Sequence, residues 1–96
     1  MTPYEEIIAN DIQKYVDERG ETYTMKITSR LTGVEEKWSI KVDRSPWWKP
    51  DAHDYRLRYY CQGELAEAIN GITLEDAAIL VKCFELSIKE RNRHIP

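Results

Sequence analysis

The chain has few cysteines and glycines and no long apolar run. Two cysteines in 96 residues are too few for a disulfide scaffold, so we expect a reduced, cytoplasmic protein. The longest uninterrupted apolar stretch, Ala77 to Val81, is far shorter than the ~20 residues that span a bilayer. No basic segment followed by an apolar one opens the chain. The sequence therefore predicts neither a secretory signal nor a membrane partner.

Motifs that carry catalysis or hold cofactors are also absent from the sequence. The 4 glycines are isolated turn residues and form neither a phosphate-binding loop nor a dinucleotide-binding fingerprint. The 2 cysteines and 2 histidines lack the spacing of about two to four residues that is typical of structural zinc ligands. The segment Asp51–Asp54 holds one histidine between carboxylates, which is typical of a solvated turn. We therefore expect no enzymatic activity, no cofactor and no metal.

Length and composition predict one folded domain over residues 1–96. The chain is 42% hydrophobic and 32% charged, which fits a small globular domain rather than a disordered segment. The net charge of −3 is unevenly distributed, because residues 1–20 and 61–96 are acidic and residues 21–60 are mildly basic. A chain that is not basic overall gives no general indication of nucleic-acid binding.

The spacing of apolar residues predicts a helix at each end of the chain. Thr2, Pro3 and Glu5 form a capping box before a helix over about residues 3–19, and Gly20 is suited to end it. Thr73 is the expected cap of a long final helix that is apolar around much of its circumference.

Between the helices the apolar spacing changes to the alternation of β-strands. Residues 23–31 and 37–43 are expected to form a hairpin, and residues 54–62 a third strand. Residues 63–71 are ambiguous between a short helical turn and a continued extended segment. We therefore predict an α+β fold of order α-β-β-β-α, with an antiparallel three-stranded meander and both helices packed on one face.

This element order resembles that of the double-stranded RNA-binding domain. The resemblance covers topology alone, since residues 71–76 carry two acids and no base where that family has phosphate-binding lysines. RNA binding by that route is therefore not expected. In size, charge and layout the chain is also similar to small acidic phage inhibitors of the anti-CRISPR kind, without a shared motif.

Strand alternation places basic side chains on the outer face of the predicted sheet. This face is expected to carry six cations against Asp43 alone, a formal charge of +5. The six are Lys26, Arg30, Lys37, Lys41, Arg56 and Arg58. One interpretation is an ordinary solvated sheet face, and the other is a surface that attracts nucleic acid or an acidic protein. Tyr60 is the one ring on this face, which disfavours a platform that stacks single-stranded bases.

The most unusual segment contains Trp47, Trp48 and Lys49 between two prolines. Adjacent side chains of an extended segment diverge, so one tryptophan is expected to face solvent. The two interpretations are that both rings cap the core, or that the exposed ring anchors a partner.

The final helix carries more apolar surface than one stripe needs. Ile79, Cys83 and Leu86 widen its apolar face. Either the first helix covers these residues, or they form the seam of a homodimer.

These features predict a small, non-enzymatic protein-binding module, an inhibitor or adaptor of bacterial or phage type. It would act through the Trp47–Trp48 loop and the basic sheet face. The alternative is a nucleic-acid-associated protein that uses the same basic face. The expected partner-binding residues are Trp47, Trp48, Lys49, Lys26, Arg30, Lys41, Arg56, Arg58 and Tyr60.

Overall fold

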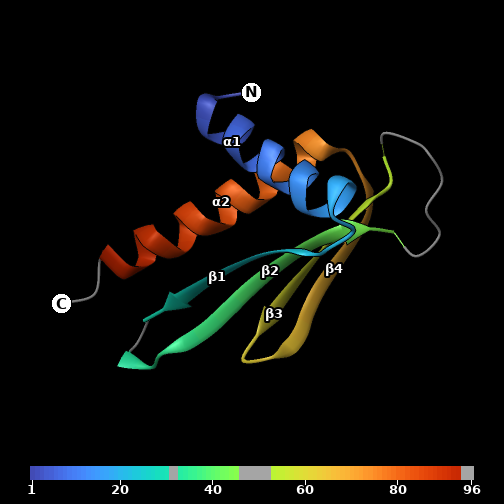
Figure 1. Ribbon diagram of the computed structural model, residues 1–96. Coiled ribbons are helices and arrows are strands. Elements are labelled where there is room, and N and C mark those ends of the chain that lie inside the picture. The colour runs from blue at the N-terminus through green and yellow to red at the C-terminus, as the bar shows by residue number, and fades with distance from the viewer. Residues whose placement is uncertain (31–32, 46–52, 94–96) are drawn as a thin grey trace.

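A four-stranded antiparallel sheet with both helices on one side forms the fold in the computed structural model, which describes residues 1–30, 33–45 and 53–93 (Figure 1). The strands lie side by side in chain order. They are β1 (Tyr23–Ser29), β2 (Glu36–Arg44), β3 (Tyr55–Cys61) and β4 (Glu64–Ile72). Helix α1 (Pro3–Ile12) continues as a π-helix over Gln13–Glu18, and α2 (Leu74–Arg93) closes the described chain. The α+β class is confirmed.

The sheet has one strand more than the three-stranded meander that the sequence predicts. Strand β4 follows β3 through a two-residue turn at Gln62 and Gly63, whose φ angles of 53° and 83° match the hairpin turns that follow the sheet twist. The sequence does not predict β4, because the alanine and glutamate residues at its start favour helices and polar and apolar residues do not alternate there. Pairing with β3 therefore overrides local preference.

The ends of both helices match the sequence prediction. Thr2 accepts a hydrogen bond from the Glu5 amide, and the Glu5 carboxylate accepts one from the Thr2 amide, which completes the capping box. Gly20 has a φ of 66° and its amide bonds back to Val16, so it ends the first helix as expected. Thr73 caps α2 through its hydroxyl, which accepts from the Asp76 amide at 3.0 Å.

The core lies between the sheet and the two helices. Its buried members are Ile8, Ala9, Ile12, Val16, Ile40, Val42, Tyr55, Leu57, Ala77, Ala78 and Val81. Met25, Ile40 and Tyr59 occupy one register row across β1, β2 and β3 on the helix side of the sheet. An ion pair between Lys82 and Glu5, 2.8 Å long, ties α2 to α1. Because both helices pack on this side, no helix of the described residues covers the opposite face of the sheet (Figure 1).

Candidate functional site

The candidate site is the open face of the sheet, here called the outer face. Paired residues on neighbouring strands point to the same side, so the register defines this face. One row crosses all four strands as Thr24, Lys41, Arg58 and Ala68, and the next as Lys26, Ser39, Tyr60 and Leu65. Lys37 and the facing pair of Asp43 and Arg56 extend the outer face along the strands.

Asp43 holds two guanidinium groups in place on the outer face. Arg56 donates to it from Nε at 3.0 Å and from Nη2 at 2.8 Å, and Arg58 donates from Nη2 at 3.1 Å. The side chain of Asp43 is 19% exposed and those of both arginines are 23% exposed. The hydrogen bond to Asp43 raises the pKa of Arg56. This cluster is therefore ordered and keeps a net positive charge.

Tyr60 lies beside this cluster with cations against its ring. The Lys41 ammonium is 5.1 Å from the ring centroid and the Arg58 guanidinium carbon is 5.8 Å from it. Leu65 of β4 pairs with Tyr60 and is 57% exposed. A shallow depression with a volume of about 430 Å³ lies at this position. Its lining residues are Ser45, Arg56, Arg58, Tyr60, Leu65, Ala68 and Asn70.

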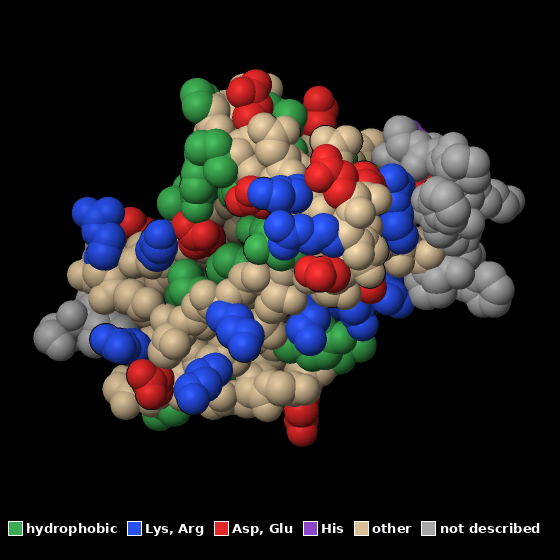
Figure 2. Space-filling model, in the orientation of Figure 1, with side chains coloured by type: hydrophobic (Ala, Val, Ile, Leu, Met, Phe, Trp, Pro, Cys, Tyr) green, Lys and Arg blue, Asp and Glu red, His purple; other side chains and the backbone are tan. Residues whose placement is uncertain are grey.

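Lysines surround this centre. Lys26 and Lys37 are exposed, and neither they nor Lys41 form an ion pair with another residue that the structure describes. The described outer face thus carries five cations against one carboxylate. Figure 2 shows lysine and arginine side chains spread over the sheet-bearing lower part of the molecule, with single acidic side chains between them.

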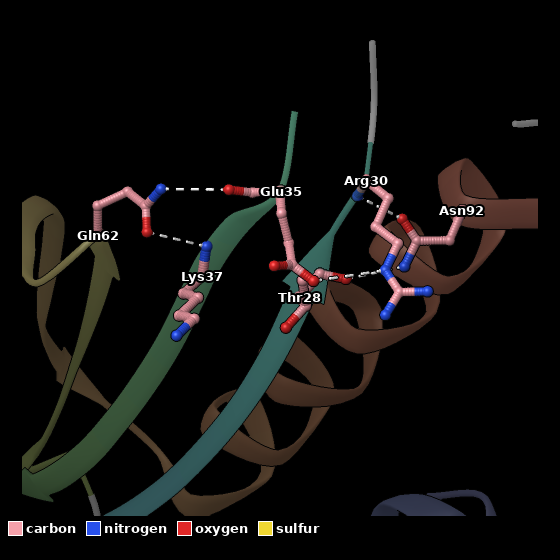
Figure 3. Close-up of polar contacts among 6 residues, drawn as sticks. All are labelled: Thr28, Arg30, Glu35, Lys37, Gln62 and Asn92. Atoms are coloured by element: carbon pink, nitrogen blue, oxygen red, sulfur yellow. Dashed lines mark hydrogen bonds and ion pairs between the residues drawn. The ribbon is translucent and has the colours of Figure 1, made fainter. Parts of the chain in front are cut away.

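Arg30, which the sequence places on the outer face, lies just beyond the end of β1 and outside the paired residues of the sheet. Strand β1 ends at Ser29, and the Arg30 amide donates to the Asn92 side chain at 2.9 Å. Its guanidinium turns to Glu35, with Nε 3.7 Å from the carboxylate (Figure 3). The paired strand residues of the outer face therefore include five of the six expected cations. Trp47, Trp48 and Lys49, the other predicted partner-binding residues, lie outside the described residues.

An apolar groove that the sequence did not predict lies on the helix side, between α2 and the strands β3 and β4. It has a volume of about 570 Å³ and is lined in part by Trp38, Tyr59 and Phe84. The Phe84 ring lies 5.6 Å from Trp38 and 5.0 Å from Tyr59, centroid to centroid. One wall of the groove is formed by β4, so the groove could not be predicted from the sequence without predicting that strand.

The surplus apolar residues of α2 are exposed in the described chain. Ile79 is 37% exposed, Leu86 is 49% exposed, and the Cys83 thiol is also in an exposed residue. Helix α1 packs beside a different part of α2, where Lys82 and Glu85 contact it. The first helix therefore does not cover these three residues.

The described residues hold no group of three or more metal-binding side chains, and no helix among them is long and apolar enough to cross a membrane. No protein-family model, curated protein or solved structure matches the chain.

Proposed function

We propose that the protein is a non-enzymatic binding module whose outer face binds an acidic surface of another protein. The observation that carries this proposal is the position of Tyr60. Its ring lies against Lys41 and Arg58, beside exposed Leu65, on a sheet face that neither helix covers. An inhibitor or adaptor of bacterial or phage type is the class of protein that we propose.

The composition of this face is that of an interface centre with a charged rim. Tyrosine and arginine are enriched among the residues that dominate binding energy. Asp43 already fixes the guanidinium of Arg58, so less conformational entropy is lost when a partner binds it. The exposed lysines around this centre favour encounter with a negatively charged partner.

The same features favour a protein over a nucleic acid. Single-stranded nucleic acids are held largely by bases stacked on aromatic rings. On the outer face of the described strands Tyr60 is the one ring, and two cations already contact it. Asp43 would also repel phosphates that approach Arg56 and Arg58.

Selection of displayed random peptides on the immobilised protein tests this proposal. Enriched peptides are then measured against a double variant, Lys41→Glu with Tyr60→Ala, which was not used in the selection. We expect enriched peptides to contain several aspartates or glutamates and an apolar residue, and to bind the double variant at least about tenfold more weakly. Lys14→Glu, on the first helix, is the matched control and should bind like the wild type.

Two results would overturn the proposal. One is a set of enriched peptides without acidic bias, or with equal affinity for the double variant. The other is tighter binding of a random DNA duplex, with affinity falling at a log–log slope of about −0.9 per neutralised phosphate as salt rises. Trp47→Ala and Trp48→Ala, measured with the same peptides, test the expectation that the loop takes part.

A further inference from the structure

The two edges of the sheet differ in regularity. Strand β1 pairs with β2 without interruption from Tyr23 to Ser29. Strand β4 pairs with β3 through two register shifts, and such bulges turn an edge away from further pairing. The regular edge is therefore that of β1, and no other strand of the described chain flanks it.

The backbone of β1 presents alternate residues to this edge. The Lys37 amide donates to the Gln62 side chain at 3.2 Å, and the Lys37 carbonyl accepts from the Gln62 amide at 2.8 Å. The backbone groups of odd-numbered residues of β2 therefore point toward β3. Even-numbered residues of β2 then face β1, and their partners in β1 are odd-numbered. The backbone groups of Thr24, Lys26 and Thr28 consequently point outward.

The side chain of Asn92 shows that this edge accepts a strand-like partner. Its Nδ2 donates to the Thr28 carbonyl at 2.8 Å, and its Oδ1 accepts from the Arg30 amide at 2.9 Å (Figure 3). A carbonyl and the amide two residues further along are the pair that a neighbouring strand engages. The Asn92 carboxamide therefore occupies the place of one residue of a neighbouring strand, at one end of the edge only.

The side chains flanking the open part of the edge differ between the two faces. Lys26 is exposed on the outer face. On the inner face Tyr23 and Met25 are only partly buried and pack against the core. Burial and the nearby charges of Asp11 and Glu85 raise the pKa of Tyr23, so acids already lie close to it. An incoming strand is thus favoured to place acidic side chains outward and apolar ones inward.

We infer that the β1 edge at Thr24 and Lys26 is a docking site for an extended segment of a partner protein that alternates apolar and acidic side chains. Such a segment adds to the sheet by backbone hydrogen bonds, and its alternate side chains read the two faces. A second copy of β1 is disfavoured, because antiparallel pairing at Thr24 and Lys26 brings the Lys26 ammonium groups of the two copies to neighbouring positions on the same face. This site goes beyond the proposed function, because it uses the backbone edge of β1, and it shares the side chains of Thr24 and Lys26 with the outer face.

A short synthetic peptide of alternating valine and glutamate is the probe, and alternating valine and lysine is its charge control. We expect the glutamate peptide to bind and to slow hydrogen exchange at the Thr24 and Lys26 amides, which should exchange faster than Met25 in the free protein. Thr24→Pro removes an outward amide without touching the β1–β2 ladder and should weaken binding about tenfold. Thr24→Val keeps the amide and should bind like the wild type.

Three further variants make the test more specific. Lys26→Glu should reverse the preference between the two peptides, and Asn92→Ala should strengthen binding because it frees the Thr28 carbonyl and the Arg30 amide. Lys41→Glu, on the outer face, should leave this peptide bound, so failure of the edge and failure of the outer face are distinguishable. Absence of binding would overturn the inference. So would unchanged binding by folded Thr24→Pro, or protected Thr24 and Lys26 amides in a dimer of the free protein.

Discussion

Arg56 and Asp43 form a bidentate ion pair on the outer face. Arg56 Nε lies 3.0 Å from Asp43 Oδ1, and Arg56 Nη2 lies 2.8 Å from Asp43 Oδ2. The residues face each other on β3 and β2, so the strand register itself creates the pair. Arg58 shares the same carboxylate. A basic face that would otherwise carry mobile side chains therefore has two fixed guanidinium groups at its centre.

Asp43→Ala should lower the free energy of unfolding by about 1–2 kcal/mol, because it leaves two partly buried guanidinium groups without their hydrogen-bond acceptor. Urea unfolding at low and moderate salt measures the change. The exposed pair of Arg93 and Glu90 supplies the control, since Glu90→Ala should change stability by less than about 0.5 kcal/mol. Equal effects of the two substitutions would contradict the role given to Asp43.

Stability should fall at acid pH through Glu5. Hydrogen bonds from Lys82 and from the Thr2 backbone hold the pKa of Glu5 at about 2, below its ordinary value of 4.5. Because the pKa of Glu5 is lower in the folded state than in the unfolded state, its ionised carboxylate stabilises the fold. This stabilisation is complete above the unfolded-state pKa and is lost as the pH falls toward 2. Urea unfolding between pH 7 and pH 2 measures this dependence.

Glu5→Gln should flatten that pH dependence, whereas Glu6→Gln, at an exposed position on the same helix turn, should leave it as in the wild type. The acid dependence would have another origin if both variants lost stability with pH as the wild type does.

The two thiols should react at different rates. Cys83 is exposed, whereas Cys61 is partly buried and donates to the Glu36 carboxylate at 3.4 Å. Burial and that hydrogen bond raise the pKa of Cys61, which lowers its thiolate fraction near neutral pH. A chromogenic disulfide reagent should therefore modify one thiol rapidly in the native protein and both after unfolding. Cys83→Ser should abolish the rapid phase, and a rapid phase that persists would contradict the assignment.

Gln62 should tolerate glycine better than alanine. Its φ of 53° is unfavourable for a residue with a Cβ, and its side chain offsets the cost by bonding to the Glu35 carbonyl and the Lys37 amide. Gln62→Ala keeps the strained conformation and loses both bonds, so it should destabilise by about 1–2 kcal/mol. Gln62→Gly relieves the strain and should cost less. Thermal melting of both variants checks the order, and a more stable alanine variant would contradict it.

The features that the sequence predicted correctly have strong local signals. The capping box and Gly20 bound the first helix, and polar–apolar alternation set the hairpin that pairs Trp38 with Ile27. The same alternation placed Lys41, Arg58 and Tyr60 on one face.

The rest depended on tertiary contacts. Strand β4 is mostly exposed and rich in helix-favouring residues, so only its pairing with β3 identifies it. The pair of Glu5 and Lys82 joins residues 77 positions apart, which no local pattern encodes. Strand β1 ends at Ser29, two residues before its predicted end, and Asn92 binds the Arg30 amide that follows. Trp38 and Phe84 are half-buried because they line the groove beside β4.

Binding of an acidic partner to the outer face can be mapped by amide chemical shifts of the labelled protein, titrated with an acidic peptide from the display selection. We expect shifts concentrated at Lys41, Arg58, Tyr60 and Leu65, with little change along α1. Shifts confined to α2 and the groove at Phe84, with the outer face unchanged, would contradict this expectation.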